Sequence, residues 1–560
     1  MGHSVEISDS FGNYFVNDTK IHDPYASVLN IEDVGIHPAQ HSQVQLFDSE
    51  PSNGQKWKLG LREWLILICI GILTMMDAFD STVLITMLPH LANTFDKSLV
   101  STFWTNTVYL VLNAGSFLYF TIMCEVFSHG VLWIIACVFT TIGTGICSGS
   151  LTLVELIVGR MIQGIGGGGV LALSFVIMAE SIPEAMHSRY SCFIMLMRLI
   201  GFILGPILGS ILSNTARWTW AFYINFIFCG FGMMAIPFAV DMRISKQIPL
   251  RKLRVLDWSG VTMAFLGPGC MLLGLSWGGV SYRWNQWETV MPIAVGGAVL
   301  LSLAFYEVIW ALHPQFDRRL LRTRAITMTY LGCFLHGFVV FCQLQFFPLY
   351  LMTTKYLSQT LSGLSLLAVN GFATIPLILI SVILAGKAHK QWIKWIIPGG
   401  WAITILAGGC SIALSPKTPI AGWIILFLTA GLGHGLLIAG YNIRVHSCSC
   451  ILGEDSEEDV PMSTKPITFA LFMWAWGMAF AVPIGSVVFL NIFGKELRQM
   501  GLDRNFINSS SGYLVLMSQV EMSDDQREAI KFASSLALRV VWEVIMGVAV
   551  LGCISSAFIE

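Results

Sequence analysis

Long apolar segments recur along most of the chain, separated by short polar stretches. A segment of about 20 apolar residues can cross the ~30 Å hydrocarbon core of a bilayer as one helix. Fourteen such segments occur, centred near Leu73, Leu112, Val138, Ala172, Leu204, Phe231, Gly267, Val295, Phe338, Pro376, Ile403, Phe427, Ala479 and Gly547. The pattern predicts an all-α polytopic membrane protein with 14 transmembrane helices.

Composition agrees with this prediction and narrows the function. The 560 residues are 55% hydrophobic and only 12% charged, which is typical of polytopic membrane proteins. Basic patches with interleaved aromatic residues are absent, so nucleic acid is not an expected partner. Cys448 and Cys450 form the closest cysteine pair, but no zinc-binding spacing completes them, and we expect no metal or cofactor.

Lysine and arginine counts in short loops predict the orientation. Residues 1–60 form a polar tail without a signal peptide. If this tail is cytoplasmic, three inner loops, within 243–254, 318–324 and 387–394, carry twelve lysines and arginines, whereas the short outer loops carry at most one each. Both termini are therefore expected in the cytoplasm. Asn508, which begins an Asn-Ser-Ser sequon in the stretch before the last span, then lies outside as a candidate glycosylation site.

An internal repeat divides the chain further. The glycines of span four recur in span twelve as Gly431, Gly433 and Gly435, and a Pro-Ile motif of span five recurs in span thirteen. Both matches are offset by eight spans, which predicts two six-helix halves with two inserted helices, a transporter architecture. The expected parts are a tail (1–60), an amino-terminal bundle (61–240), a basic loop with two inserted helices and a linker (241–324), and a carboxyl-terminal bundle (325–560) with a long outer loop at 495–535.

Three ionisable residues stand out inside predicted spans. Asp77 and Asp80 are three residues apart and share one face of span one. At about 1.5 Å per residue from the outer ends of the spans, Asp77 and Asp80 lie ~14 and ~9 Å deep, and Arg160 of span four lies ~14 Å deep. Charges inside a membrane are costly and face a protein interior or cavity, so we expect the three to meet. They would either exchange protons in step with cargo binding or form a structural ion pair.

Other residues in the spans have packing or titrating roles. The residues Gly164 to Gly169 let neighbouring backbones approach closely. In span five, Gly201, Gly205 and Gly209 form a flat ridge around Pro206, which we expect to contact the other half. Arg198 is expected to reach the cytoplasmic interface. His434 takes the repeat position of Gly167, either as a second titrating site or as an inert buried histidine. Glu307, His336 and Glu543 are isolated ionisable groups that either line a cavity or lie at an interface.

At these residues the chain resembles the fourteen-span drug:proton antiporter group of the major facilitator superfamily, and within it fungal toxin and secondary-metabolite efflux pumps. The similar segments are Asp80 to Pro89, Arg160 to Gly164, Gly201 to Gly209, and Trp218 to Asn225. The resemblance implies proton-coupled export. With the ionisable residues described above, the candidates for proton coupling are Asp77, Asp80, Arg160 and His434. The candidates for cargo binding and helix packing are Gln163, Gly164, Gly166, Gly201, Gly205, Pro206 and Gly209.

One loop departs from the pattern of this group. Between spans two and three, the group carries an acidic residue followed by a Gly-Arg-Lys/Arg signature that the resemblance links to the inner gate. Here Glu125 keeps the acid, whereas His129 replaces a permanent cation. The sequence therefore predicts altered or pH-sensitive gating.

These features favour a monomeric plasma-membrane exporter of a small amphiphilic compound, driven by protons, with the vacuolar membrane as a second location. An importer of a siderophore or nutrient on the same fold is the nearest alternative. A receptor or membrane enzyme is a more distant one, since no nucleophile with a placed base and no metal cluster occurs in the sequence.

Overall fold

The fold consists of long helices. The computed structural model describes residues 59–559 except 98, 125, 184–185, 215–217, 241–255, 311–317, 322, 368–373, 376–389, 455–464 and 501–522. The amino-terminal group comprises α1 (Leu61–Thr82), α2 (Leu88–Thr94), α3 (Leu99–Met123), α4 (His129–Gly149), α5 (Leu153–Ser181), α6 (His187–Asn214) and α7 (Trp220–Ala239). Two further helices follow, α9 (Trp258–Trp277) and α10 (Trp287–Ile309). The carboxyl-terminal group comprises α11 (Arg324–Thr353), α12 (Gln359–Leu366), α14 (Lys390–Ser411), α15 (Ile420–Glu454), α16 (Lys465–Gln499) and α18 (Asp524–Ser556).

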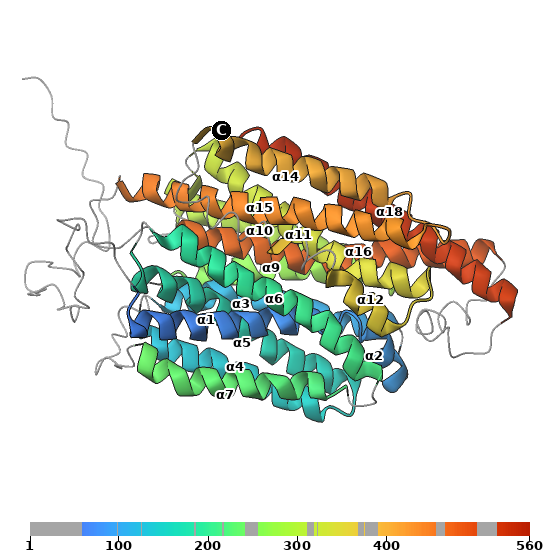
Figure 1. Ribbon diagram of the computed structural model, residues 1–560, viewed down its shortest axis with the longest axis horizontal. Coiled ribbons are helices and arrows are strands. Elements are labelled where there is room, and N and C mark those ends of the chain that lie inside the picture. The colour runs from blue at the N-terminus through green and yellow to red at the C-terminus, as the bar shows by residue number, and fades with distance from the viewer. Residues whose placement is uncertain are drawn as a thin grey trace, which may run out of the picture. The chain divides into compact units, whose positions relative to one another are not determined.

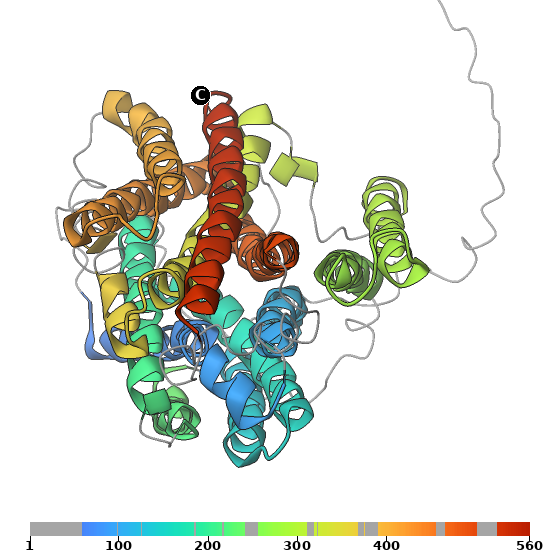
Figure 2. The same cartoon turned by 90° about the vertical axis from the view of Figure 1, so that its right-hand side faces the viewer.

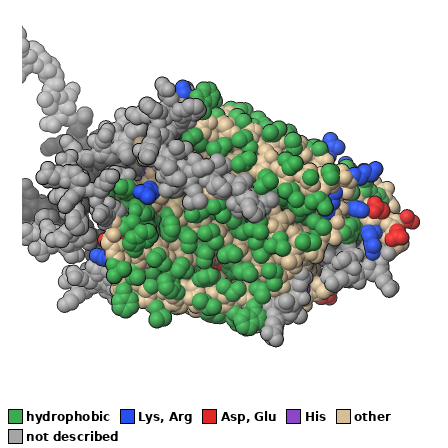
Figure 3. Space-filling model, in the orientation of Figure 1, with side chains coloured by type: hydrophobic (Ala, Val, Ile, Leu, Met, Phe, Trp, Pro, Cys, Tyr) green, Lys and Arg blue, Asp and Glu red, His purple; other side chains and the backbone are tan. Residues whose placement is uncertain are grey.

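Apart from these helices, the described residues contain a short 3-10 helix, Arg318–Leu321, and one isolated β-bridge between Gly278 and Tyr282. Within the same residues, eleven helices are long and apolar enough to cross a membrane. Figure 1 shows the long helices running side by side. Figure 3 shows hydrophobic side chains over much of one face and charged side chains gathered toward one end. The arrangement is that of a multi-pass membrane protein.

Local signals in the sequence explain where several helices begin and end. Thr152 and Glu155 form a capping box that starts α5, and Ser523 and Gln526 form another that starts α18. Because of the second box, α18 begins at Asp524, while α16 extends to Gln499. Both ends of the stretch 495–535, which was expected to be an outer loop, are therefore helical.

The helices pack in two groups, and α9 and α10 pack against each other beside them. In the amino-terminal group, α1 packs on α6 and α7, and α5 packs on α3 and α4. In the carboxyl-terminal group, α11 packs on α16 and α18, and α14 packs on α15. Figure 2 shows α9 and α10 at one side of the helices, and α9 contacts both α3 and α16. The hydroxyls of Tyr119 and Thr262, 2.9 Å apart, join α3 to α9.

A repeated glycine contact relates the two groups. A Cβ added at Gly201 of α6 would clash with the carbonyl oxygen of Met75 in α1, and a Cβ added at Gly477 of α16 would clash with that of Phe334 in α11. In each group the glycine therefore lets a later helix lie directly on the backbone of the first long helix. This equivalence relates α1 to α11 and α6 to α16.

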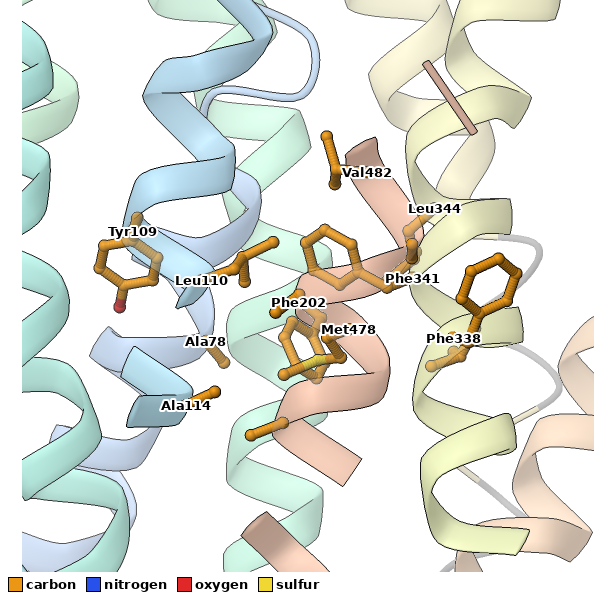
Figure 4. Close-up of a cluster of buried hydrophobic side chains, with 14 of the residues drawn as sticks. Ala78, Tyr109, Leu110, Ala114, Phe202, Phe338, Phe341, Leu344, Met478 and Val482 are labelled. Atoms are coloured by element: carbon orange, nitrogen blue, oxygen red, sulfur yellow. The ribbon is translucent and has the colours of Figure 1, made fainter. Parts of the chain in front are cut away.

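The two groups meet at an apolar cluster, which Figure 4 shows. The amino-terminal helices contribute Ala78, Leu110 and Phe202, and the carboxyl-terminal helices contribute Phe341 and Met478, all of them buried. At this cluster the surface between the groups is therefore filled by hydrophobic and aromatic side chains.

Candidate transport site

The glycines of α5 bring three helices close together. A Cβ on Gly164 would lie 2.5 Å from the carbonyl oxygen of Tyr109 in α3, and a Cβ on Gly166 would lie 2.6 Å from that of Ala136 in α4. No side chain of any size fits at such distances from a backbone. The glycine run therefore sets the spacing of α3, α4 and α5, so that polar side chains from these helices reach one another.

Arg160 of α5 is completely buried. Its guanidinium donates hydrogen bonds to the backbone carbonyls of Asp80 (2.7 Å) and Thr105 (3.4 Å) and to Oε1 of Gln163 (2.7 Å). The guanidinium carbon also lies 4.0 Å from the centre of the Tyr109 ring. Arg160 and Asp80 meet, as the sequence predicts, but Arg160 bonds the backbone of Asp80 and not its carboxylate.

The Asp80 carboxylate is held by two amides. Gln163 donates from Nε2 to Oδ2 at 2.9 Å, and Asn225 of α7 donates to Oδ1. Gln163 also donates to the hydroxyl of Thr144 at 3.2 Å. Since Gln163 accepts from Arg160 with its oxygen and donates to Asp80 with its nitrogen, it links the cation to the carboxylate. Asn225 lies in a segment noted only for its resemblance, and its contact with Asp80 was not foreseen.

Asp77 has a separate set of partners. Its Oδ1 accepts hydrogen bonds from Tyr109 (2.9 Å) and Asn113 (2.6 Å) of α3, and its Oδ2 forms an ion pair with Arg198 of α6 at 2.7 Å. Gly167 leaves room for this cluster, because a Cβ there would lie 2.5 Å from Asp77 Oδ1. The two carboxylates, one turn apart on α1, therefore belong to two connected but distinct networks.

The expectation that Arg198 reaches the cytoplasmic interface is wrong. Its side chain is 2% exposed and lies against Asp77. The helix α6 begins at His187, so Arg198 lies about three turns into the helix rather than one. A buried carboxylate within reach provides the counter-ion that makes this depth tolerable. The sequence did contain a signal for this pair. Arg198 is a cation inside an apolar span, and the predicted site of Asp77, Asp80 and Arg160 gave it no partner.

The expected role of the glycine ridge in α6 also needs correction. Gly201, Gly205 and Gly209 face α1 of the same group, where added Cβ atoms would meet backbone oxygens or Thr82. The contact with the other group is made beside the ridge, where Gly363 of α12 packs on the carbonyl of Pro206. The glycines of the ridge let the backbones of α1 and α6 approach closely, and these two helices carry Asp77 and Arg198.

In the carboxyl-terminal group, His434 of α15 is fully buried and lies 2.6 Å from Oε1 of Gln343 through its Nε2. Its ring centre is 5.4 Å from that of His336 in α11. The sequence suggested that His336 is isolated, but it packs against His434. His336 also takes the place of Asp77 in the repeat. Asp77 follows Met75, whose carbonyl faces Gly201, by two residues, and His336 follows Phe334, whose carbonyl faces Gly477, by two residues.

One of the remaining predicted sites, His129, lies at a helix end. His129, at the start of α4, lies 3.3 Å from Oε2 of Glu180 at the end of α5. This contact joins the loop between the second and third spans to the helix that carries Arg160. Glu125 and Asn508 lie outside the described residues.

Many membrane-length helices, with buried charged side chains that contact one another between them, are typical of an integral membrane transporter. The family model described as Major Facilitator Superfamily matches residues 70–449, and the chain therefore belongs to that superfamily. The superfamily consists of transporters, so the prediction that the chain is not an enzyme is confirmed. The predicted all-helical fold is confirmed as well.

Relatives and solved structures agree with this assignment. The chain is 26% identical over 511 residues to an MFS efflux transporter of Aspergillus oryzae, covering 90% of each protein. It is 26% identical over 497 residues to an MFS-type transporter of the acurin A biosynthesis cluster of Aspergillus aculeatus, covering 87% of each. A bacterial homologue of the human lysosomal transporter Spinster shares the fold, with a TM-score of 0.56, 14% identity, and coverage of 90% of this chain and 98% of that one. The resemblance to fungal efflux transporters is thereby confirmed.

Proposed function

We propose that the protein exports a small amphiphilic organic compound, such as a toxin, drug or secondary metabolite, in exchange for protons. The observation that carries this proposal is the buried network of Asp77, Asp80, Arg160 and Arg198 in the amino-terminal helices. With both carboxylates ionised, its two acidic and two basic charges cancel. The proposed energy source is the proton gradient, and no cofactor takes part.

Charge balance is what links a proton to a change of conformation. A proton on either carboxylate leaves one uncompensated positive charge in a site that water does not reach. Such a charge is strongly unfavourable unless the site becomes hydrated or its partners move. Proton binding therefore favours a conformation in which the site is open, and a ligand that prefers one conformation shifts the equilibrium in this way.

The surface between the two helix groups suggests the nature of the cargo. The buried cluster of Figure 4 consists of apolar and aromatic side chains, including Leu110, Phe202, Phe341 and Met478. A compound that enters between the groups would replace these contacts with contacts of its own. An amphiphilic molecule with a large apolar part fits this surface, and the two fungal relatives are named as an efflux transporter and as part of a biosynthesis cluster.

Helix α6 provides the contacts that must break and re-form during transport. Near its start, Ser191 lies 2.7 Å from Nε2 of His446 in α15. Near its end, Ser213 donates to Gln359 of α12 at 2.8 Å. Both ends of α6 are thus attached to the carboxyl-terminal group. Rocking of the two groups would release one end at a time, which gives the cargo access from one side only.

The proposed topology has 14 spans. Three spans are added to the eleven candidate spans to make this number. They are α3 with 25 residues, α14 with 22 residues, and a span near Pro376 that falls largely outside the described residues. Both termini lie in the cytoplasm and the protein works as a monomer in the plasma membrane. The pair α9 and α10 is the insertion between two six-helix halves.

Export and its coupling can be tested in cells that express the protein. Cells are loaded with lipophilic dyes, including Nile red, and the loss of dye is followed with and without a protonophore. We expect the wild type to speed the loss, and Asp80→Asn, Arg160→Ala and the protonophore each to return the rate to that of cells without the protein. Asp96→Asn is the matched control, because Asp96 is an exposed aspartate in a left-handed backbone conformation that asparagine also adopts.

Surface expression of each variant is matched before rates are compared. Dye accumulation raised by the wild type would favour the importer. Efflux that survives both the protonophore and Asp80→Asn would contradict proton coupling at this site.

A further inference from the structure

Arg198 belongs to the amino-terminal group but also touches the carboxyl-terminal group. Its guanidinium forms the 2.7 Å ion pair with Asp77, and its central carbon lies 5.5 Å from the ring centre of Trp474 in α16. Phe202, one turn further along α6, is also 5.5 Å from the guanidinium and 6.0 Å from the Trp474 ring. The cation therefore lies between a carboxylate on one helix group and an aromatic face on the other.

The positions of Arg198 and Trp474 correspond within the repeat. Arg198 precedes Gly201 by three residues, and Trp474 precedes Gly477 by three residues. These two glycines make the equivalent contacts with α1 and α11. The matching faces of α6 and α16 thus meet at this point, where one group presents a cation and the other an aromatic ring. Cations are attracted to the faces of aromatic rings, most strongly to that of tryptophan.

The hold on Arg198 depends on the charge of Asp77. Among the described residues, the buried Nε atom of Arg198 has no hydrogen-bond partner, and Nη1 forms the ion pair with Asp77. If Asp77 takes up a proton, the guanidinium loses its counter-ion and keeps a neutral carboxyl group and the aromatic rings as neighbours. A buried, uncompensated cation then moves toward water or toward another partner, and the contact with Trp474 changes with it.

Asp80 lacks this connection. The hydrogen-bond donors to its carboxylate among the described residues, Gln163 and Asn225, belong to α5 and α7, which are both amino-terminal helices. The titratable groups around Asp77 are Tyr109 from α3, Arg198 from α6, and the neighbouring Asp80 and Arg160. Among the described residues, Arg198 is the one of these groups that reaches an aromatic ring of the carboxyl-terminal group.

We propose that Arg198 is a positioning residue that transmits the charge state of Asp77 to the carboxyl-terminal helices through Trp474. The inference rests on the proposed proton-coupled export and assigns the two carboxylates different tasks. Asp77 signals across the boundary between the groups, while Asp80 acts within the amino-terminal group.

Fluorine NMR of the full-length protein tests this contact without any cargo. The 18 tryptophans are replaced with 5-fluorotryptophan, the protein is placed in lipid nanodiscs, and the Trp474 resonance is identified by its absence in Trp474→Phe. We expect this resonance to shift with pH in the wild type and in Asp80→Asn, and to stop shifting in Asp77→Asn. Asparagine keeps an oxygen for Arg198 but cannot change its charge. The resonance of exposed Trp220 serves as the internal control.

Two other results of the NMR experiment would overturn the inference. A Trp474 resonance that does not titrate in the wild type shows that α16 does not sense the proton. A titration that survives Asp77→Asn, or that disappears in Asp80→Asn, assigns the signal to another group. Dye efflux from cells expressing the same variants separates this inference from the proposed function. Proton-driven efflux with a silent Trp474 overturns only the contact, whereas a titrating Trp474 with proton-independent efflux overturns only the proposed function.

The role of the ring itself is tested by substitution at Trp474. Trp474→Phe keeps an aromatic face and should retain proton-driven efflux, whereas Trp474→Leu keeps only apolar bulk and should lose it. Equal efflux from both variants at matched expression would show that the cation does not act through the ring.

Discussion

Arg198→Gln is expected to destabilise the folded protein by about 3–5 kcal/mol, because it leaves the Asp77 carboxylate buried without its counter-ion. Tyr109 and Asn113 still donate hydrogen bonds to Asp77, but neither supplies a charge. The double variant Asp77→Asn/Arg198→Gln removes both charges and should recover most of the loss. Thermal unfolding of the purified single and double variants in one detergent measures the coupling between the two residues.

The control for this experiment is Arg189→Gln on the same helix, since Arg189 is exposed. It should change stability by no more than about 0.5 kcal/mol. If Arg198→Gln is as stable as Arg189→Gln, or if Asp77→Asn gives no recovery, the ion pair is not a determinant of the fold.

Gly201→Leu is expected to prevent folding of the amino-terminal group. A Cβ at this position would meet the backbone oxygen of Met75 and lie 2.8 Å from the Ala78 Cβ, and neither atom can move without displacing α1. Overpacking of a well-packed interior typically costs about 1–3 kcal/mol, and a clash with backbone exceeds what side-chain adjustment relieves. We expect a loss of monodisperse protein in size-exclusion chromatography of solubilised membranes.

Gly230→Leu is the matched control. Gly230 also lies within a membrane-length helix, α7, but a Cβ there has no neighbour within 4 Å. It should give as much folded protein as the wild type. A normal yield from Gly201→Leu would mean that α1 and α6 can separate, and would contradict the close backbone contact on which the Asp77 and Arg198 pair depends.

The candidate site was predictable in part. The presence of Asp80 and Arg160 inside apolar segments was enough to predict that they meet, because charges in a bilayer need a protein environment. The mode of contact was not predictable. Arg160 bonds the backbone of Asp80, and Gln163 and Asn225 hold its carboxylate. Which amide reaches which oxygen depends on the rotation of three helices about their axes, and segment length and hydropathy carry no information on that rotation.

The corrected predictions have the same physical origin. The glycines of α6 marked a close contact between helices, but the sequence does not state which neighbour they face, and the structure shows that it is α1. Likewise, Arg198 was assigned to the membrane interface from its place one turn inside the predicted span, and its counter-ion lies 121 positions away in the chain. Such contacts follow from the packing of helices that are distant in sequence.

The sequence by itself determined the membrane class, the helical fold and the residues whose burial demanded partners. Hydropathy and glycine content suffice for this, because the bilayer imposes helix length and excludes unpaired charges locally, segment by segment. Only the tertiary structure decided that two carboxylates one turn apart have different partners, and that Arg198 lies between Asp77 and Trp474. Those contacts join residues of six helices, so they are fixed by how the helices pack and not by any one segment.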